Sequence, residues 1–380
     1  MTTTAGPSGT STRLDRATVR RFVLEHVAPR AAEFDRTEWI PRDVLAELAT
    51  AGLWGAALPA PDGSSAVDWV GFGAAHEEVG RGCSSVRSLL TVHSMVCAAV
   101  ERWGTSLQRE RWMEALRSGS VLGAFCLTEP EAGSDTAALA TRAVKRAGHW
   151  VLDGHKKWIT GGRIADLLLV FARAEAGAAA FLVPRSAPGV EVSPLHGVLG
   201  TRGSMLAEIR FTSVDAGPDA LVGPERFGTA IVMADCLDLG RYSVACGSLG
   251  IAQACLDICA EYTSRRRVQG RPLRELQLIR AKVADMVTGT AAARLLCERA
   301  GRLRGAGDQG SVMATWMAKY FASRTAAVSA SDAVQILGAN GCSPDYPAER
   351  LYRDSKVMEI IEGSTEIQQL TIAGEAYRGH

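Results

Sequence analysis

The residues best suited to chemistry lie near the C-terminus, where Glu362 ends an apolar stretch and precedes Gly363 and Ser364. A carboxylate beside apolar residues is poorly solvated, which raises its pKa toward the range where it accepts a proton in catalysis. The neighbouring glycine lets the backbone approach a bound ligand without an intervening side chain. Taken alone, the same residues could equally form a helix end with a solvated acid.

A second motif lies far away in the sequence, at residues 127–135 (Leu-Thr-Glu-Pro-Glu-Ala-Gly-Ser-Asp). Thr128 offers a hydroxyl, and a turn at Gly133 and Ser134 can direct backbone amides at a phosphate group. By itself this segment is also compatible with a polar loop that leads into a sheet. The two motifs together narrow the interpretation.

Together they resemble the acyl-CoA dehydrogenase family of flavoproteins. The resemblance covers nearly the whole chain, in the family's order. Its signatures are Thr-Glu-Pro-x-Ala-Gly-Ser-Asp at residues 128–135, Gln-Ile-Leu-Gly-Ala-Asn-Gly at residues 335–341, Arg353-Asp354 and Glu362-Gly363.

The resemblance implies an acyl-CoA dehydrogenase-like fold in three parts. An α-helical N-terminal domain is expected at residues 1–120, with residues 1–12 disordered. A middle β-domain is expected at residues 121–229, and a C-terminal four-helix bundle domain at residues 230–380.

The sequence pattern independently supports this layout. Residues 41–52 begin with proline, carry apolar residues on one helical face and end at Gly52, which predicts a capped helix. Between residues 121 and 222 short apolar runs alternate with turns, which predicts strands at 167–171, 180–183 and 209–211 and a hairpin turn at Asp153-Gly154. The third part returns to helical spacing, in the sets Leu276, Ile279, Val283, Met286, Val287 and Val312, Met313, Trp316, Met317, Tyr320.

The resemblance implies that FAD is the cofactor and that one group of residues binds it. By analogy the Trp158 indole packs on the flavin ring and Thr160 bonds near its N5. The complete set is Phe125, Leu127, Thr128, Gly133, Ser134, Trp158, Ile159, Thr160, Arg266, Gln277, Gln335, Gly338, Gly341, Ser364 and Glu366. In the family the neighbouring subunit holds part of the adenosine end, which implies a homodimer or homotetramer. Gln269 and Ala339 depart from the family's pattern at that end.

The resemblance also implies the catalytic residue and the substrate contacts. Glu362 matches the family's base, and the Gly363 N–H matches a donor to the thioester carbonyl. Ser134, Asp238, Arg241 and Arg87 are the other predicted substrate contacts. For Asp238 and Arg241 a buried helix ion pair is an equal alternative. One subgroup of the family takes its base from the position before this arginine, where the chain has Gly240, which cannot act as one.

Arg87 bears on the choice of substrate, because it lies on the helix around residues 83–95, where the family shapes its acyl pocket. A guanidinium there suits a short, polar or carboxylated acyl group. Arg81 could contribute in the same way. The alternative is that both arginines point to solvent or cap the helix.

This helix and residues 358–364 resemble the acyl-carrier-protein dehydrogenases of polyketide extender-unit pathways. That resemblance implies oxidation of a 2-hydroxy-3-oxopropionyl group to a hydroxymalonyl group on a carrier protein, with hydride transfer to flavin N5. The alternative is a catabolic short- or branched-chain acyl-CoA dehydrogenase that forms a 2-enoyl-CoA and passes electrons to an electron-transfer flavoprotein. A flavin monooxygenase of this fold usually lacks the glutamate, and a non-catalytic carrier-binding subunit would not need the flavin motifs.

Composition limits the expected partners, membrane segments, disulfides and metal sites. The 380 residues carry a net charge of +1, which gives no reason to expect nucleic acid as a partner. No uninterrupted apolar stretch of membrane-spanning length is evident, so we expect no membrane segment. The nine cysteines are dispersed without a CxxC pair, so we expect neither disulfides nor a metal site, and a cytoplasmic location. Cys255 and Cys259 lie one helical turn apart but have no histidine partner.

Overall fold

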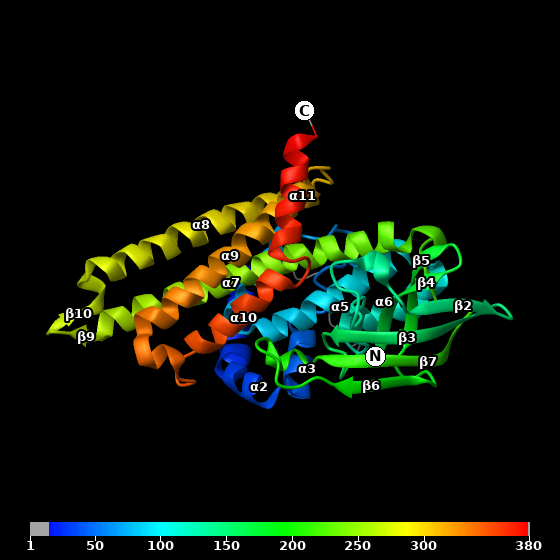
Figure 1. The fold of residues 1–380 in the computed structure, drawn as a ribbon, viewed down its shortest axis with the longest axis horizontal. Helices are drawn as coiled ribbons and strands as arrows, with labels where there is room; N and C mark the ends of the chain where they lie inside the picture. Colours follow the sequence, from blue (N-terminus) through cyan, green and yellow to red (C-terminus); the bar gives the residue numbers. More distant parts are fainter. Residues whose placement is uncertain (1–14, 379–380) are drawn as a thin grey trace, which may run out of the picture.

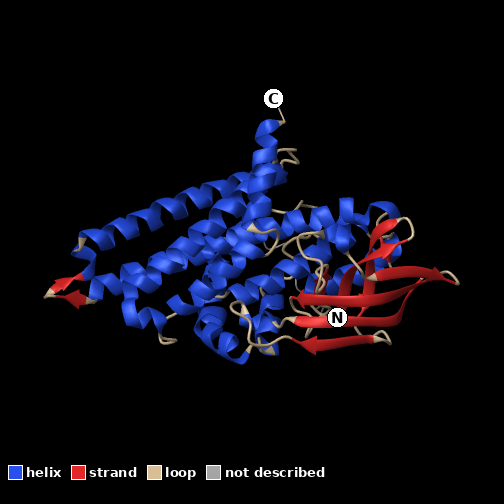
Figure 2. Cartoon of the chain, in the orientation of Figure 1, coloured by secondary structure: helices blue, strands red, loops and turns tan. Residues whose placement is uncertain are grey.

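The computed structural model describes residues 15–378 and is built from helices at both ends of the chain with a sheet between them (Figures 1 and 2). The predicted disorder of residues 1–12 therefore falls outside the described residues. The N-terminal helices are α1 (Arg16–Phe22), α2 (Ala31–Thr37), α3 (Arg42–Thr50), α4 (Trp69–Gly82), α5 (Ser84–Trp103) and α6 (Ser106–Ser118). This element order agrees with the three-part division that the sequence predicts, whose exact boundaries remain a prediction.

Local sequence explains where these helices begin and end. Pro41 precedes α3, and Gly52 follows it with a φ of 70°, as the sequence predicts. Thr105 and Gln108 form a capping box at the start of α6, and Gly119 closes that helix with a φ of 73°.

The middle of the chain forms an eight-stranded sheet (red at one end of the molecule in Figure 2). Seven strands follow the order β6-β7-β3-β2-β4-β5-β8, and β1 pairs in parallel with β4. The strands predicted at 167–171, 180–183 and 209–211 are confirmed within β4, β5 and β7. The bounds are β1 (Gly123–Cys126), β2 (Arg142–Arg146), β3 (His149–Ile159), β4 (Leu167–Ala174), β5 (Gly177–Pro184), β6 (Val190–Pro194), β7 (Ala207–Gly217) and β8 (Leu221–Val222).

The hairpin turn predicted at Asp153-Gly154 is wrong, because β3 runs straight through both residues. The turn between β2 and β3 lies at Ala147 and Gly148, which have φ values of 47° and 87°. Gly154 instead permits a close approach, since a Cβ there would lie 2.4 Å from Thr141 Oγ1. The pairing of β3 with β7 also shifts register between Leu152 and Gly154. The Asp-Gly pair therefore marks an irregularity within a strand and not a turn.

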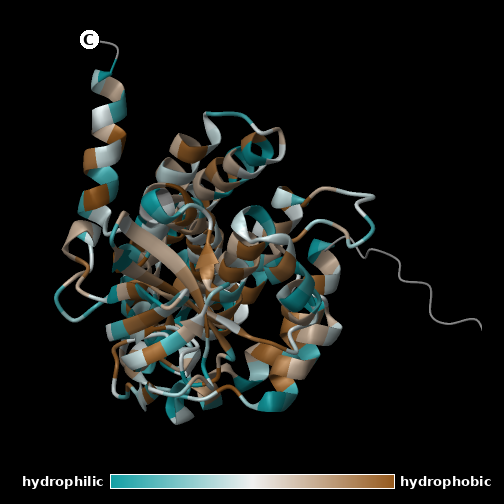
Figure 3. Cartoon of the chain, turned by 90° about the vertical axis from the view of Figure 1, so that its right-hand side faces the viewer, coloured by the Kyte–Doolittle hydropathy of each residue, from teal (hydrophilic) through white to brown (hydrophobic). Residues whose placement is uncertain are grey.

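The C-terminal helices surround one long central helix. They are α7 (Ala234–Arg265), α8 (Gln277–Gly305), α9 (Ser311–Leu337), α10 (Ala348–Ile360) and α11 (Thr365–Tyr377). A small hairpin of β9 (Arg267–Val268) and β10 (Arg271–Pro272) joins α7 to α8 at the end of the molecule opposite the sheet (Figure 1). Helix α11 stands away from the body in Figures 1 and 3, and its Leu370 is 71% exposed.

Helix α7 corrects the expectation about membrane-spanning length. Residues 230–265 are long and apolar enough to cross a membrane by length and composition alone. However, 72% of their apolar window is buried inside the protein. The helix packs against α4, α5, α8 and α9, so its apolar surface is that of a core helix.

Candidate active site

Glu362 lies directly after α10 in a strained backbone conformation. Its φ is 56°, in the left-handed region that residues other than glycine rarely adopt, and Gly363 follows with a φ of 94°. Side chains from neighbouring helices hold residues 361–364, which we call the Glu362 loop. Arg241 Nε on α7 donates to the Glu362 carbonyl oxygen at 3.0 Å, and Lys319 Nζ on α9 donates to the Gly363 carbonyl oxygen at 2.7 Å. Such strain persists where the surrounding structure fixes the backbone, which is common at active sites.

The Glu362 carboxyl group has the environment of a base. Its Oε2 is buried and has no hydrogen-bond partner within residues 15–378. Burial raises the pKa of Glu362 to about 7, although Arg241, Lys319 and Arg87 act in the opposite direction. The carboxylate also faces Gly240, where a Cβ would lie only 2.5 Å from Oε2. Gly240, which cannot serve as a base, thus leaves room for the Glu362 carboxylate.

Asp238 and Arg241, the substrate contacts predicted on α7, do not pair with each other. Asp238 forms its salt bridge with Arg304 on α8. Arg241 stacks its guanidinium on Trp316, 4.0 Å from the ring centre, and holds the Glu362 loop. The alternative of an Asp238–Arg241 ion pair is therefore wrong, and Arg241 lies beside Glu362.

Arg87 is buried inside the protein, which excludes the solvent-facing and helix-capping alternatives. Its side chain is 1% exposed, and it donates to Ser88 Oγ at 2.9 Å, to Thr91 Oγ1 at 3.0 Å and to Met358 Sδ at 3.2 Å. Its Nε has no partner within the described part of the chain. Gly247 leaves room for it, because a Cβ there would lie 2.6 Å from Arg87 Cδ. Burial lowers the pKa of Arg87 to about 10, so it is charged at neutral pH.

A series of hydrogen-bonded buried side chains runs from Arg87 and Thr91 on α5, through Ser243 on α7, to His76 on α4. Thr91 Oγ1 lies 2.6 Å from Ser243 Oγ, which in turn lies 2.8 Å from His76 Nδ1. Burial lowers the pKa of His76 to about 3, so its ring is neutral. Neutral groups thus fix the orientation of Arg87 without neutralising its charge.

Two other side chains on these helices have partners of their own. Arg81 does not join the predicted acyl pocket, because it forms a salt bridge of 2.6 Å with Asp257. His93 is packed in the protein interior. Its Nδ1 accepts from the Gly123 N–H at 3.1 Å, so its Nε2 donates to the Leu116 carbonyl oxygen at 2.9 Å.

The segments predicted to hold the flavin ring meet at one end of the sheet. Lys157 N donates to the Thr128 carbonyl oxygen at 2.9 Å, which brings the second motif beside Trp158 at the end of β3. A buried ion pair between Lys156 and Glu129 (2.7 Å) fixes the two segments together. The Trp158 indole is 51% exposed despite its size, as is expected of a platform for a ligand. Phe125, Leu127 and Ile159 are buried behind this surface, Thr128 and Thr160 are half-buried, and Gly133 and Ser134 are exposed.

The residues predicted to bind the adenosine end lie far from this surface. Arg266 and Gln277 are exposed and flank the β9–β10 hairpin, at the opposite end of the molecule from the sheet (Figure 1). Gln335 and the turn containing Gly338 and Gly341 lie nearby, because Asn340 Nδ2 donates to Tyr262 Oη near the end of α7 at 3.0 Å. Within a single chain, the two halves of the predicted FAD site do not meet. Ser364, the last residue of the Glu362 loop, occupies the N-cap position of α11, and Glu366 lies in the first turn of that helix.

The signature Arg353-Asp354 connects α10 to the other two parts of the chain. Arg353 forms a salt bridge with Asp35 on α2, and the buried Asp354 accepts from Thr201 N after β6. Gly200 permits this approach, since a Cβ there would lie 2.5 Å from the Arg353 carbonyl oxygen. These contacts fix the helix that carries Glu362 relative to the flavin-facing segments.

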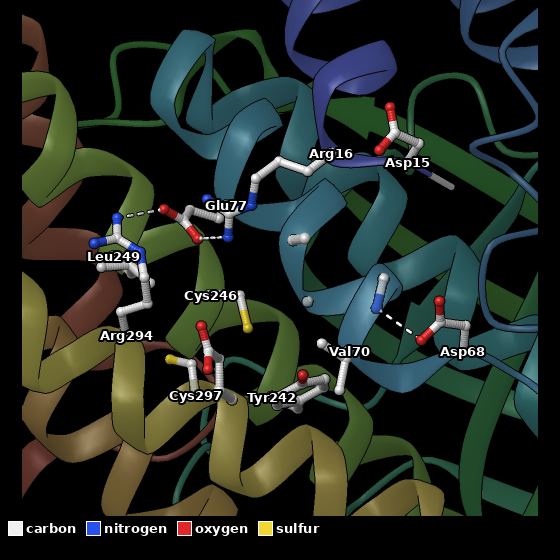
Figure 4. A pocket seen from close by; sticks show the side chains of 14 residues that line it. Asp15, Arg16, Asp68, Val70, Glu77, Tyr242, Cys246, Leu249, Arg294 and Cys297 are labelled. Carbon is white, nitrogen blue, oxygen red and sulfur yellow. Dashed lines mark hydrogen bonds and ion pairs between the residues drawn. The ribbon is translucent and has the colours of Figure 1, made fainter. Parts of the chain in front are cut away.

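A cavity of about 410 Å³ lies elsewhere, between α4, α7 and α8 (Figure 4). None of the predicted site residues lines it. Its wall carries Glu77, which bonds to Arg16 and to Arg294, and its floor includes Tyr242 and Cys246. The predicted chemistry therefore belongs to the Glu362 region and not to this cavity.

The sequence analysis missed Lys319, which is fully buried and contacts the Glu362 loop. A sequence signal does exist for it. Lys319 is one position after Ala318 and four after Thr315, and both of those small residues belong to the buried face of α9. A lysine within such a face must find an internal partner.

Three family models match successive parts of the chain. They are described as the N-terminal domain of acyl-CoA dehydrogenase at residues 11–120, the middle domain at residues 124–214 and the C-terminal domain at residues 227–377. The chain belongs to the acyl-CoA dehydrogenase family. It is therefore an oxidoreductase of a family that uses FAD, with the helical, β and helical domains of that family.

Curated relatives support the same assignment. An acyl-CoA dehydrogenase of Bacillus subtilis is 38% identical over 364 residues, covering 94% of this chain and 96% of the relative. A mitochondrial short-chain specific acyl-CoA dehydrogenase of Rattus norvegicus is 36% identical over 371 residues, covering 96% of this chain and 90% of the relative.

Solved structures include relatives with different acyl groups. Butyryl-CoA dehydrogenase from Megasphaera elsdenii matches with a TM-score of 0.92 at 31% identity, covering 98% of this chain and 100% of that one. A glutaryl-coenzyme A dehydrogenase in complex with glutaryl-CoA matches with a TM-score of 0.91 at 30% identity, covering 98% of this chain and 96% of that one. FkbI, for biosynthesis of the methoxymalonyl extender unit of a polyketide, matches with a TM-score of 0.87 at 34% identity, covering 95% of this chain and 98% of that one.

The residues of this chain fit the family's cofactor. The exposed Trp158 indole offers a stacking face, and the Thr128 and Thr160 hydroxyls offer polar groups near it. The turn at Gly133 is open, since a Cβ there would meet no atom within 4 Å. When bound, FAD supplies the electron acceptor for the oxidation of the acyl group.

Proposed function

We propose that the protein is an FAD-dependent dehydrogenase for a short acyl thioester whose acyl group ends in a carboxylate or an equally polar group. The preferred substrate is a 2-hydroxy-3-oxopropionyl group on an acyl carrier protein, which becomes a hydroxymalonyl group. The observation that carries this proposal is the buried Arg87 beside the Glu362 region.

Arg87 is a buried cation without an acidic partner. No carboxylate lies within 4.0 Å of it among residues 15–378. Charges inside proteins are normally paired, because desolvation of an isolated charge is costly. A carboxylate on the acyl group, such as the one that forms on the hydroxymalonyl product, could supply the missing partner in a bidentate, charge-assisted pair, and the oxygens of the aldehyde hydrate could accept hydrogen bonds from the same guanidinium. Its contact with Met358, one helical turn before Glu362, ties the guanidinium to the helix that ends at the base.

In this proposal Glu362 accepts a proton and Gly363 binds the thioester carbonyl. Glu362 takes a proton from the substrate, either from the α-carbon of a saturated acyl group or from a hydroxyl of a hydrated aldehyde. The Gly363 N–H has no acceptor among the described residues, so it is free to donate to the thioester carbonyl. A preorganised donor of this kind typically lowers the barrier by about 3 kcal/mol.

We further propose that the enzyme is a homodimer or homotetramer in the cytoplasm that passes its electrons to an electron-transfer flavoprotein. The separation of the end of β3, which carries Trp158, from the β9–β10 hairpin, which follows Arg266, supports the oligomer, because a second copy could complete the FAD site (Figure 1). The C-terminal helices also expose large apolar side chains, including Leu278 at 81% and Leu370 at 71%. A contiguous patch of such side chains would be typical of a surface that another chain covers.

The test compares acyl groups and carriers on the same enzyme. Purified holoenzyme is mixed with the 2-hydroxy-3-oxopropionyl thioester on a carrier protein and on CoA, and with butyryl-CoA and glutaryl-CoA. Flavin bleaching is followed by stopped flow. The proposal expects the polar thioesters to bleach the flavin faster than butyryl-CoA, and the carrier-protein form to be fastest. Fast bleaching by butyryl-CoA alone would contradict it.

The second candidate is a short-chain acyl-CoA dehydrogenase of catabolism that forms a 2-enoyl-CoA. The identities of 36–38% with relatives that include short-chain specific enzymes favour this candidate. It predicts that butyryl-CoA outcompetes every polar acyl group. It also predicts that removal of the Arg87 charge spares or improves activity.

A further inference from the structure

Lys319 is a buried lysine that contacts the backbone on both sides of the catalytic glutamate. It lies on α9, is 0% exposed, and donates to the Gly363 carbonyl oxygen at 2.7 Å. Its Nζ also approaches the Glu359 carbonyl oxygen, in the last turn of α10, at 3.5 Å. Within residues 15–378 no carboxylate lies within salt-bridge distance of it. Its charge is therefore directed at the ends of the segment that contains Glu362.

We propose that Lys319 is a positioning residue for the dehydrogenation reaction, which clamps the Glu362 loop in its left-handed conformation and supplies a buried positive charge that favours the ionised form of the base. The clamp acts on carbonyl oxygens at the C-terminal end of a helix, where a cation is favourable. The inference rests on Glu362 being the base, which a Glu362 variant tests separately, and it does not depend on the identity of the acyl group.

Electrostatics support both roles. Lys319, Arg241 and Arg87 are the cations that act on Glu362, and all three oppose the rise of its pKa. Lys319 in turn is acted on by Glu362, Glu359 and Glu366, which raise its pKa, and by Arg241, which lowers it. Burial is the largest effect and brings the pKa of Lys319 to about 8. The ammonium is therefore charged at neutral pH, when the base must be ionised.

A second donor to the same carbonyl oxygen provides a matched control. Gln368 on α11 is buried, and its Nε2 donates to the Gly363 oxygen at 3.0 Å. Lys319→Met removes a hydrogen bond and a charge, whereas Gln368→Leu removes a hydrogen bond only. Comparison of the two variants separates the electrostatic role from the mechanical one.

The experiment measures flavin reduction by stopped flow as a function of pH, with FAD content and thermal melting recorded for each protein. The reductant is whichever thioester reduces the wild-type enzyme. We expect Lys319→Met to slow reduction roughly 10- to 100-fold with FAD retained, and to move the acidic limb of the profile upward by about one pH unit. The sign follows because loss of a nearby cation makes Glu362 easier to protonate. Gln368→Leu should slow reduction without moving the limb.

The contrary result is a Lys319→Met enzyme that reduces its flavin at the wild-type rate and with the wild-type pH profile, even if it melts at a lower temperature. That result would assign Lys319 to stability alone. If Lys319→Met does not fold, Lys319→Arg replaces it, because it keeps the charge and changes the geometry. Slower reduction with an unmoved acidic limb then supports the proposal, and a wild-type rate overturns it.

Discussion

The two ends of the predicted site differ in how much of it one chain supplies. Around Glu362, helices α5, α7, α9 and α10 bring Arg87, Arg241 and Lys319 to one buried point, and the backbone is held in a strained conformation. Around the β9–β10 hairpin, Arg266 and Gln277 are exposed. The first region is buried and preorganised, as the proposed reaction centre requires, and the second is an open surface.

This difference indicates that the chemistry and the cofactor affinity have separate structural origins. The contacts described around Glu362 come from helices α5, α7, α9 and α10 of one chain. The adenosine end depends on what covers the hairpin, for which we propose a second copy. Changes near Glu362 should therefore alter rates with FAD retained, whereas changes near the hairpin should alter FAD binding and leave the reaction centre intact.

Replacement of the base should have the largest effect. Glu362→Gln keeps the shape of the side chain but cannot accept the proton, so we expect turnover to fall by roughly 10³-fold. The visible flavin absorbance should remain, because the predicted flavin contacts around Trp158 are untouched. Steady-state turnover and FAD content per chain are the two measurements. A loss of FAD in parallel with activity would contradict the separation of the two regions.

Loss of the Arg87 charge should change selectivity. Arg87→Leu removes the proposed partner of a substrate carboxylate, so kcat/KM for a carboxylated thioester should fall by about 100-fold. Activity on butyryl-CoA should be unchanged or higher. Arg81→Leu is the matched control, because that arginine binds Asp257 outside the site. If Arg87→Leu loses activity equally on both substrates, Arg87 does not determine the acyl group.

A smaller effect is expected from crowding of the base. Gly240→Ala places a methyl group 2.5 Å from Glu362 Oε2, which must displace the carboxylate. We expect a roughly 10- to 30-fold fall in the rate of flavin reduction, since small misplacements of a catalytic group are costly. Gly374→Ala, which adds a methyl group with no atom within 4 Å, is the control and should keep the wild-type rate. An unchanged rate in Gly240→Ala would show that the carboxylate acts from elsewhere.

The smallest effect concerns the hairpin. Arg266→Ala should weaken FAD binding by about 10-fold, the loss expected for one charge-assisted hydrogen bond to a phosphate. Flavin reduction in the FAD-saturated enzyme should stay near the wild-type rate. Arg265→Ala is a suitable control, because Arg265 pairs with Glu261 on the surface of α7. FAD titration and sedimentation mass report binding and assembly, and unchanged FAD affinity would remove Arg266 from the site.

Sequence reasoning predicted the order of helical and β domains because that order is local or carried by the family resemblance, and the assignment of Glu362 as the base is a prediction from the same resemblance. It failed where a residue's role depends on what packs against it. Asp153-Gly154 has the composition of a turn, yet Gly154 is required for contact with Thr141 inside the sheet. The length and apolarity of α7 come from its central position in the core.

The same limit applies to the charged residues. Sequence spacing offered Asp238 and Arg241 as a pair, but α8 supplies Arg304 to the first, and the Glu362 loop occupies the second. The spacing of large apolar residues predicted the helix α9, but most of the residues that this helix buries are small, and Lys319, Ile336 and Leu337 are the larger ones. The small residues around Lys319 indicate that the lysine is buried, but a single sequence does not reveal which backbone carbonyl oxygen it contacts.

The most direct test of the central claim is the pH dependence of single-turnover flavin reduction at low thioester concentration, which reports the free enzyme. A base must be ionised to accept a proton, so the wild-type rate should fall as pH drops below about 7, the pKa of Glu362. Glu362→Gln should be slow at every pH and lack this limb. A Glu362→Gln enzyme that keeps both the rate and the limb would contradict the assignment of Glu362 as the base.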